Sequence, residues 1–445
     1  MKIIIIGGVA AGTSAAAKAS RNDPSAQITL YEKDHYISYS GCGMPYFIGD
    51  LLTDSHKLNP RDPAWFKTKY NVEVKTTQEV LRILPVGHKV IVRNLTSGET
   101  FQESYDKLII ATGARAFLPP IKGSDGDQVF SLRNFGDMLR IKAFIATNQP
   151  KSAVIIGSGS IGMEVCENLV RLGLAVTVIE KLPQVVPVID SALASLVESH
   201  LKSKGVRVIT GADVSEITRE AVLLKSGERI SCDLALISTG IRPESALAEK
   251  AGAALGVSGS IQVDATLKTS LPDIYACGDC AENFHVVTGK PVYRPLGTTA
   301  NKMGRIAGDA VTGGTLEYKG TLGTGIFKVF DLAVGMTGLS EKEALDEGYP
   351  VTVIRHDNYS KPDYFDGKKL SIKAVVDQSN GKLLGAQVVG EDGADKRLDV
   401  YATAITLNGK ASDLSQLDLA YSPPFSTTRD PVLYTGMIFE SLEAD

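Results

Sequence analysis

The stretch of residues 153–162, AVIIGSGSIG, decides the fold class of this chain. Its apolar start predicts a buried strand, the motif GSGSIG forms a full G-x-G-x-x-G turn, and a helical pattern follows through Leu172. A second predicted strand, Ala175–Ile179, ends at Glu180, which lies 18 residues after Gly162 (180 − 162). Strand, glycine turn, helix, strand and acid in this order make up the unit that binds an adenine dinucleotide.

The same pattern occurs at the start of the chain. Residues 2–12, KIIIIGGVAAG, carry Gly7 and Gly12, although Val9 stands where the strict motif has its middle glycine. A second strand, Gln27–Tyr31, ends at Glu32, 20 residues after Gly12 (32 − 12). A lone glycine motif is equally compatible with an ordinary turn. Two copies, each with a correctly placed acid, predict two bound dinucleotides, one per domain.

Each glycine in the second motif has a separate task. Gly157 makes the turn, Gly159 lets the backbone approach a pyrophosphate, and Gly162 lets the helix pack closely on the strand. An acid at Glu180 binds a ribose 2′-hydroxyl and repels a 2′-phosphate, so the sequence favours NADH over NADPH. The neighbouring Lys181 softens that preference.

Three further apolar strands end in turn residues. Residues 105–113 (YDKLIIATG) and 232–240 (CDLALISTG) both end in Thr-Gly, and residues 269–279 (TSLPDIYACGD) deliver Asp279 to a glycine turn. From about Gly323 the pattern changes to short strands alternating with helices, which predicts an α+β module. The predicted strands there are 325–330, 350–356 and 383–389, and the predicted helices are 340–347 and 396–407.

Composition narrows the class of protein. With 445 residues, two to three domains are expected, and a net charge of -4 without a basic excess argues against a nucleic-acid partner. No apolar run approaches the roughly 18 residues of a membrane span. Five cysteines, and a strand that starts directly after Met1-Lys2 with no room for a signal peptide, favour the cytoplasm. The six histidines show no ligand spacing, so no metal is expected.

Taken together, the two glycine units, the paired Thr-Gly motifs and TSLPDIYACGDC (269–280) resemble the pyridine nucleotide–disulfide oxidoreductases over essentially the whole chain. The resemblance implies an α/β fold with two Rossmann-like dinucleotide-binding domains and a C-terminal α+β dimerisation domain. FAD is then expected on residues 1–114 and 241–321, and NAD(P)H on residues 115–240. Residues 322–445 are expected to form a homodimer.

The same resemblance implies the cofactor contacts. Asp279 is expected to hydrogen-bond the FAD ribityl chain, and Glu32 the adenosine ribose. The full FAD set is Gly7, Gly12, Glu32, Lys33, Thr112, Gly113, Asp279, Pro295, Gly297 and Thr299. The NAD(P)H set is Gly157, Gly159, Gly162, Glu180 and Gly240.

Cysteine content selects a branch of the family. Residues 40–46, SGCGMPY, hold Cys42 with no partner cysteine nearby. That pattern resembles the branch of coenzyme A-disulfide reductases, NADH oxidases and NADH peroxidases. Oxidases and peroxidases usually carry histidine at the fourth position of the first glycine loop, where this chain has Ala10. At the fourth position of the second loop, Ser160 replaces a common tyrosine, so oxygen is expected to react faster with the flavin.

Two tyrosines complete the expected site. Tyr421 precedes Pro-Pro, and Tyr364 begins a Tyr-Phe-Asp-Gly turn, although nearby Tyr359 is an alternative to Tyr364. In the family such tyrosines reach across the dimer to the other subunit's cysteine, and Tyr421 is a candidate proton donor there. Tyr421 is alternatively an interface packing residue.

The predicted chemistry is NAD(P)H-dependent reduction of coenzyme A disulfide, or of related low-molecular-weight disulfides, persulfides or polysulfides, by way of Cys42. A helix start after Cys42 predicts a lowered thiol pKa and a thiolate at neutral pH. The alternatives are a buried, inert Cys42 and a redox pair at Cys277 and Cys280. The rival functions are O2 reduction, electron transfer to a ferredoxin-like partner, and a non-enzymatic redox sensor.

Overall fold

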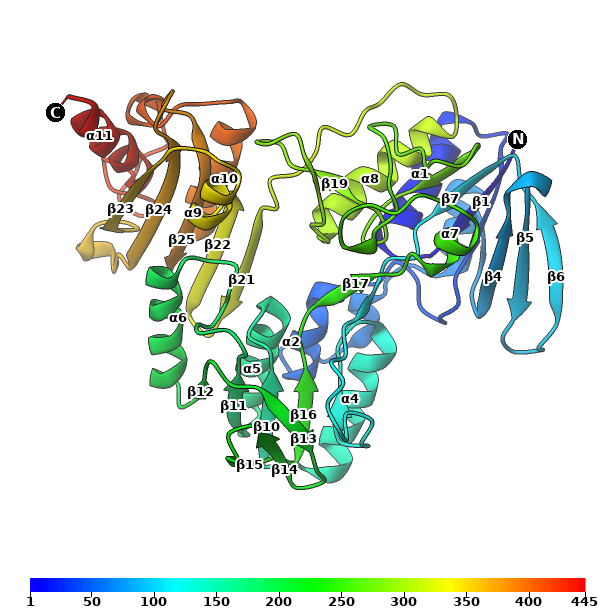
Figure 1. Ribbon diagram of the computed structural model, residues 1–445, viewed down its shortest axis with the longest axis horizontal. Helices are drawn as coiled ribbons and strands as arrows, with labels where there is room; N and C mark the ends of the chain where they lie inside the picture. Colours follow the sequence, from blue (N-terminus) through cyan, green and yellow to red (C-terminus); the bar gives the residue numbers. More distant parts are fainter. Residues whose placement is uncertain (445) are drawn as a thin grey trace.

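The computed structural model of the protein describes residues 1–444, which fold into three lobes, each built around a five-stranded sheet (Figure 1). The first lobe contains the N-terminus, the second lies below it in Figure 1, and the third contains helix α11 near the C-terminus.

The sheets of the first and second lobes are both parallel. The strands β7-β1-β2-β3 of the first are arranged like β16-β10-β11-β12 of the second. The first sheet has the order β18-β7-β1-β2-β3 and the second β12-β11-β10-β16-β9. In each, the strand that leads into the glycine motif lies between the strand that ends at the acid and the strand that ends at Thr-Gly. The first sheet is made of β1 (Lys2–Ile6), β2 (Gln27–Tyr31), β3 (Glu73–Lys75), β7 (Lys107–Ile110) and β18 (Ile274–Ala276). The second is made of β9 (Val129–Phe130), β10 (Ser152–Ile156), β11 (Ala175–Ile179), β12 (Arg207–Ile209) and β16 (Leu234–Ile237).

The chain crosses between these two lobes twice. It leaves the first lobe through β8 (Ala114–Ala116), returns through β17 (Ile241–Pro243), and the two crossing strands pair antiparallel. Strand β18 then joins the first sheet beside β7. We therefore propose the division into 1–114 with 241–321, 115–240 and 322–445, because the crossings fall at the first two boundaries.

Two helices of the first lobe touch backbone to backbone. Helix α1 (Ala10–Asn22) follows the first glycine loop, and α8 (Gly297–Ala310) packs along it. A Cβ atom on Gly304 would lie 2.2 Å from the carbonyl oxygen of Ala11, so only glycine permits this approach. The contact fixes both helices over one face of the first sheet.

The third lobe is antiparallel, with strand order β21-β22-β25-β24-β23. The bounds are β21 (Gly325–Val329), β22 (Leu332–Gly338), β23 (Val351–Tyr359), β24 (Lys369–Asp377) and β25 (Leu383–Gly390). Helices α10 (Ala394–Thr406) and α11 (Pro431–Ala444) pack against the sheet, and α9 (Glu341–Asp346) begins at a Ser340 capping box. The predicted strands and helices of this module are confirmed, while β22, β24 and α11 were not predicted.

The second and third lobes are joined by buried polar contacts. Lys373 on β24 pairs with Asp190 at 2.8 Å and with Glu341 at 2.5 Å, and Gln387 exchanges two hydrogen bonds with Asp190. Two three-stranded antiparallel sheets are also present: β4 (Gln78–Leu84), β5 (Lys89–Asn94) and β6 (Thr100–Ser104) in one, and β13 (Val214–Ile217), β14 (Ala221–Leu224) and β15 (Arg229–Ser231) in the other. Strands β19 (Asn283–Phe284) and β20 (Pro291–Val292) form a further antiparallel pair. Among residues 1–444, no helix is long and apolar enough to span a bilayer.

Candidate functional site

Both glycine loops require glycine at the turn. Gly7 and Gly157 have φ values of +108° and +102°. A Cβ on Gly7 would lie 2.1 Å from the carbonyl oxygen of Ala111, and a Cβ on Gly157 would lie 2.3 Å from that of Ser238. Ala111 and Ser238 directly follow the neighbouring strands β7 and β16. At the third position, a Cβ on Gly12 or Gly162 would lie 1.9 or 2.4 Å from the oxygen of the turn glycine. The tasks assigned to the turn and packing glycines therefore match the geometry.

The first acid is tied to its own loop. One carboxylate oxygen of Glu32 accepts a hydrogen bond from the Gly8 amide at 2.7 Å, and the other accepts one from the Asp34 amide at 2.9 Å. Burial raises the pKa of Glu32. Because a carboxylate has about four lone-pair sites, Glu32 keeps about two for a ribose.

The second acid repeats this geometry. Glu180 accepts a bond from the Ser158 amide at 2.9 Å and one from the Leu182 amide at 2.9 Å. The Ser158 hydroxyl adds a third bond at 2.7 Å and accepts one from the Val186 amide at 3.0 Å. Glu180 thus anchors the loop that follows it and keeps about one acceptor site free for a ribose hydroxyl.

The residues present fit two dinucleotides. Helix α1, helix α5 (Ser160–Arg171) and helix α8 all begin without a side-chain cap, so their first amides remain available to phosphate oxygens. A Cβ on Gly159 or Gly297 would meet nothing within 4 Å, which leaves open space at the start of α5 and α8.

The remaining predicted cofactor residues lie around this cradle. Gly113 and Gly240 end their strands with positive φ, and the Thr112 hydroxyl donates to the Glu244 carbonyl at 2.6 Å. Pro295, Gly297 and Thr299 stand at the start of α8, and Lys33 is exposed beside Glu32.

Asp279 has a partner that the sequence patterns do not single out. Its carboxylate pairs with Arg133 at 2.9 Å, and Arg133 also donates to the Ala114 carbonyl at 2.8 Å. The Tyr293 hydroxyl donates to the Asp279 carbonyl at 3.0 Å. Since Arg133 follows β9 of the second lobe and Asp279 follows β18 of the first, this ion pair joins the two lobes.

Cys42 lies where the first lobe contacts the second. It occupies a 3-10 turn, Gly41–Gly43, and its thiol is free and exposed. The next helix, α2 (Met44–Ile48), lies beside α5 and α4 (Phe135–Asn148) in Figure 1. Its Met44 and Ile48 are buried in one core cluster with residues of both helices. A Cβ on Gly49 would lie 2.1 Å from the Asn168 side chain of α5, so the contact is close.

The charges around Cys42 come from both of these lobes. Although Cys42 is exposed, surrounding atoms partly desolvate its thiol, and this desolvation raises the pKa of Cys42; Glu164 and Asp279 raise it further, and Arg133 alone lowers it. The helix start after Cys42 is confirmed. The lowered pKa expected from it is wrong for the protein alone, because desolvation of the thiol and two carboxylates oppose the thiolate.

Glu164 and Tyr46 are site residues that no sequence motif indicates. Glu164 lies on α5, one turn after Ser160, and burial raises its pKa to about 7. The Tyr46 hydroxyl donates to Glu164 at 3.4 Å, and burial raises the pKa of Tyr46 to about 12. An acid on the inner face of the helix after a glycine loop is the signal that could have found Glu164.

We expect Glu164→Gln to lower the pKa of Cys42, because it removes a negative neighbour. The pH of half-maximal alkylation of the reduced protein by iodoacetamide should therefore fall. The folded-state pKa of Glu164 is raised, so its contribution to stability is complete below about 4.5 and lost as pH rises through about 7. Glu164→Gln should remove that loss from the pH profile of thermal unfolding.

Glu167→Gln is the matched control, since Glu167 lies on the same helix but bonds the Phe330 amide at 2.9 Å and does not act on Cys42. An unchanged alkylation profile in Glu164→Gln would remove Glu164 from the site.

The predicted tyrosines lie in the third lobe. Tyr421 is 49% exposed and Tyr364 is 73% exposed, and Tyr359, the last residue of β23, is exposed as well. Helix α2, which directly follows the Cys42 turn, lies beside α4 and α5 and away from α11 of the third lobe (Figure 1). One chain therefore brings Cys42, Asp279 and the nucleotide loops together, but not the tyrosines.

The other four cysteines are buried. Cys277 and Cys280 are fully buried and free, and burial raises the pKa of both thiols, which argues against the alternative redox pair. Cys166 on α5 and Cys232, which lies between β15 and β16, are in the core.

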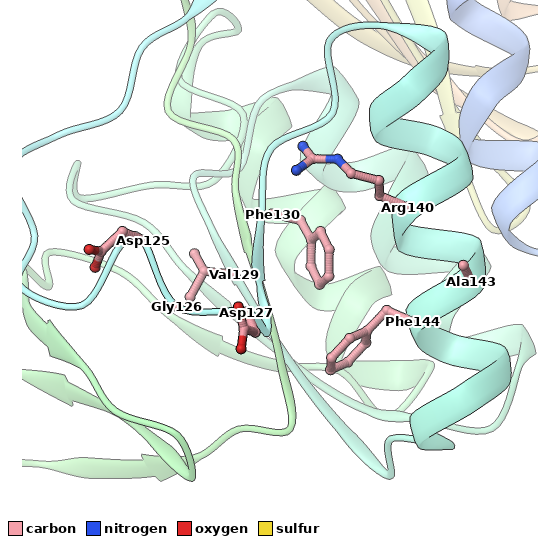
Figure 2. A pocket seen from close by; sticks show the side chains of 8 residues that line it. All are labelled: Asp125, Gly126, Asp127, Val129, Phe130, Arg140, Ala143 and Phe144. Carbon is pink, nitrogen blue, oxygen red and sulfur yellow. The ribbon is translucent and has the colours of Figure 1, made fainter.

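A separate hollow of about 500 Å³ lies at the outer end of the second lobe (Figure 2). The rings of Phe130 and Phe144 stack edge to face there beside Arg140. Its lining residues are Asp125, Gly126, Asp127, Val129, Phe130, Arg140, Ala143 and Phe144. None of them belongs to a glycine loop or to the surroundings of Cys42.

Comparison with known proteins identifies the family. Residues 1–304 match the family model described as pyridine nucleotide-disulphide oxidoreductase, and residues 325–431 match its dimerisation domain. The chain therefore belongs to the pyridine nucleotide-disulphide oxidoreductase family. It is an oxidoreductase of two cofactors, FAD and pyridine nucleotide, and it forms a homodimer. The predicted family and fold class are thereby confirmed.

Relatives place the chain within that family. It is 34% identical to the NAD(P)H sulfur oxidoreductase (CoA-dependent) of Pyrococcus furiosus, over 99% of both chains. It is 32% identical to the coenzyme A disulfide reductase of Staphylococcus haemolyticus, over 98% of both, and 32% identical to an NADH oxidase of Methanocaldococcus jannaschii, over 97% of both. Among solved structures, reduced Bacillus anthracis CoADR-RHD superposes with a TM-score of 0.97 at 39% identity, covering 99% of this chain and 80% of that one.

Proposed function

We propose that this protein is an NAD(P)H-dependent, FAD-containing reductase of coenzyme A disulfide, or of related low-molecular-weight disulfides, persulfides or polysulfides. The observation that carries the proposal is Cys42, the one exposed cysteine among the described residues, placed where the two nucleotide-binding lobes meet. The names of the relatives from P. furiosus and S. haemolyticus agree with this chemistry.

The cofactors are assigned by lobe. The loop at Gly7–Gly12, Glu32, Asp279 and the start of α8 would hold FAD, and the loop at Gly157–Gly162 with Glu180 would hold NAD(P)H. FAD supplies hydride acceptance from NAD(P)H and delivery of an electron pair to sulfur. Ser160 is exposed at the start of α5, so this chain places no aromatic cover at that position.

Cys42 supplies the nucleophile. Its thiolate attacks one sulfur of R–S–S–R, so that a Cys42–S–S–R bond forms as the substrate disulfide breaks and one thiolate leaves. Reduction of that mixed disulfide by two electrons frees the second thiol and regenerates Cys42. The balance is NAD(P)H + H⁺ + RSSR → NAD(P)⁺ + 2 RSH.

The leaving thiolate needs a proton, and we assign Tyr421 as its donor, with Tyr364 beside it. Both tyrosines are exposed on the third lobe, whereas Cys42 lies where the first two lobes meet, so the proposal places them in the partner subunit's site. We also place the enzyme in the cytoplasm, because all five cysteines are unpaired, as expected in a reducing compartment.

Reduction of O2 is the second candidate, favoured by the likeness to the M. jannaschii NADH oxidase and by the exposed Ser160. In that reaction Cys42 would cycle through a sulfenic acid. Ala10, at the fourth position of the first loop, offers no acid–base group for a peroxide and disfavours it.

Mass spectrometry of the purified protein, with anaerobic turnover of coenzyme A disulfide, tests the proposal. We expect one FAD per chain, an adduct on Cys42 of about the mass of coenzyme A, and oxidation of one NAD(P)H per two thiols released. A protein that oxidises NADH only when O2 is present would favour the oxidase. A colourless protein that cannot be reconstituted with FAD would overturn the whole assignment.

Glu180→Ala should weaken the binding of NADH more than the binding of NADPH. The change removes a charged acceptor, worth about 2 kcal/mol or roughly 30-fold in affinity, and it also removes the repulsion of a 2′-phosphate. Stopped-flow flavin reduction against the concentration of each nucleotide measures both affinities. Glu180→Gln is the companion variant, because it loses the charge but keeps the side-chain length and one acceptor oxygen, enough for one of the two amides that bond Glu180. An unchanged NADH to NADPH ratio in both variants would exclude Glu180 from the site.

A further inference from the structure

One buried arginine in the third lobe connects the two loops that carry the proposed tyrosines. Arg397 lies on α10, and only 1% of its surface is exposed. A buried guanidinium carries a large desolvation penalty unless all of its donors are satisfied. The partners of Arg397 therefore indicate what the residue holds in place.

Its first partner is Asp430, which directly precedes α11 and is 3% exposed. Arg397 donates to both carboxylate oxygens, at 3.2 Å from Nε and 2.9 Å from Nη2, a forked geometry that lysine cannot reproduce. Burial alone raises the pKa of Asp430, but the Arg397 charge and the Ser426 hydroxyl bring it below its usual value. The pair is thus ionised and fixed in direction.

The second set of contacts reaches the Tyr421 loop, defined as residues 421–426. Arg397 Nη2 donates to the buried Ser426 hydroxyl at 3.1 Å, and that hydroxyl donates to Asp430 at 2.7 Å. Within the loop, the amides of Phe425 and Ser426 donate to the Ser422 carbonyl at 2.8 and 3.1 Å. Ser426 therefore anchors the turn that directly follows Tyr421.

The third contact reaches the Tyr364 loop, defined as residues 360–367. The same Nη2 donates to the Ser360 carbonyl at 2.9 Å. The Ser360 hydroxyl bonds Asp392 at 3.0 Å and accepts from the Lys368 amide at 3.0 Å, which closes the base of the loop. One nitrogen atom thus ties the loops of both tyrosines to one carboxylate.

We infer that Arg397 is a positioning residue, which fixes the Tyr364 and Tyr421 loops relative to each other so that both tyrosines enter the partner subunit's site in register. This inference rests on the proposed function, because it assigns Arg397 a task only if Tyr421 acts there. Arg397 itself touches neither substrate nor cofactor. Its effect on turnover must pass through the tyrosines.

Hydrogen exchange measured by mass spectrometry on the holoenzyme dimer is the first test. In Arg397→Lys, peptides that cover the two loops should exchange at least about fivefold faster, while peptides of β24 and β25 stay protected. Ser426→Ala should loosen the Tyr421 loop alone, and it serves if Arg397→Lys fails to bind FAD or to dimerise. Lys396→Met is the matched control, since the Lys396 ammonium lies 3.4 Å from Asp430 but forms no hydrogen bond or ion pair with either loop.

A double-mutant cycle with Tyr421→Phe is the second test. Arg397→Lys should lower kcat for coenzyme A disulfide by roughly tenfold while flavin reduction by NADH stays unchanged. In the Tyr421→Phe background the same change should have a smaller effect, of about threefold or less, because only Tyr364 is left to be positioned.

The outcomes separate this inference from the proposed function. Unchanged exchange in both loops, or an equal loss of kcat in both backgrounds, would overturn the positioning role. A Tyr421→Phe enzyme as active as wild type would overturn it as well. If the wild-type enzyme does not reduce coenzyme A disulfide at all, the proposed function falls, and the exchange data alone still decide whether Arg397 fixes the loops.

Discussion

Cys42→Ser is expected to lower coenzyme A disulfide turnover by on the order of 10⁴-fold or more, because loss of a covalent nucleophile has effects of that size in other enzymes. The serine hydroxyl stays protonated at neutral pH and cannot replace a thiolate. Reduction of the flavin by NADH should stay near the wild-type rate, since it depends on the nucleotide loops and Glu180. Stopped-flow absorbance separates the two half-reactions, and slow oxidation by O2 should survive.

Cys277→Ala and Cys280→Ala are the matched controls, because both thiols are free and fully buried. Each should keep disulfide turnover close to wild type. Turnover in Cys42→Ser at a rate near wild type would show that Cys42 is not the redox cysteine, and the two buried thiols would then become the candidates.

The parallel lobes were the most predictable part of the fold. The central strands there are buried on both faces, so they appear as uninterrupted apolar runs next to a glycine turn, such as Ile3–Ile6 or Ala153–Ile156. The strands Gln27–Tyr31 and Ala175–Ile179 match the prediction residue for residue. Local sequence suffices because the glycine turn, the apolar run and the acid all lie within about 30 residues.

The antiparallel parts were harder to predict. Strand β24 reads KLSIKAVVD, in which Ser371 and Lys373 are nonetheless buried because partners elsewhere satisfy them. Lys373 is held by Asp190, 183 positions away (373 − 190), and by Glu341. No pattern within one strand reveals such partners, so tertiary contact overrides the polar appearance of the segment.

The candidate site divides in the same way. The positions of the glycines and acids were predictable from their spacing, because each acid accepts a hydrogen bond from its own glycine loop and each turn glycine is required by the backbone next to it. Arg133 and Glu164 were not, since their roles arise only where two lobes meet. The prediction of a lowered Cys42 pKa was wrong for the same reason. The helix start after Cys42 favours the thiolate, whereas desolvation of the thiol and the charge of Glu164 oppose it.

Tyr421→Phe is expected to lower kcat for coenzyme A disulfide by roughly 10²-fold, the usual contribution of a general acid. Phenylalanine keeps the ring and removes only the proton that the leaving thiolate needs. Flavin reduction by NADH should be unaffected. A loss confined to KM would instead indicate that Tyr421 only packs against the substrate or the interface.

Mixed dimers show which subunit's cysteine Tyr421 serves. In a heterodimer of one Cys42→Ser chain and one Tyr421→Phe chain, action across the dimer leaves one complete site, made of Cys42 from the second chain and Tyr421 from the first. Such a heterodimer, isolated with two different affinity tags, should show about half of wild-type activity. Action within one chain would leave Cys42 paired only with Phe at position 421, and activity would stay about 10²-fold low. Because Tyr421 is exposed on the third lobe while Cys42 lies where the first two lobes meet, we expect the first result.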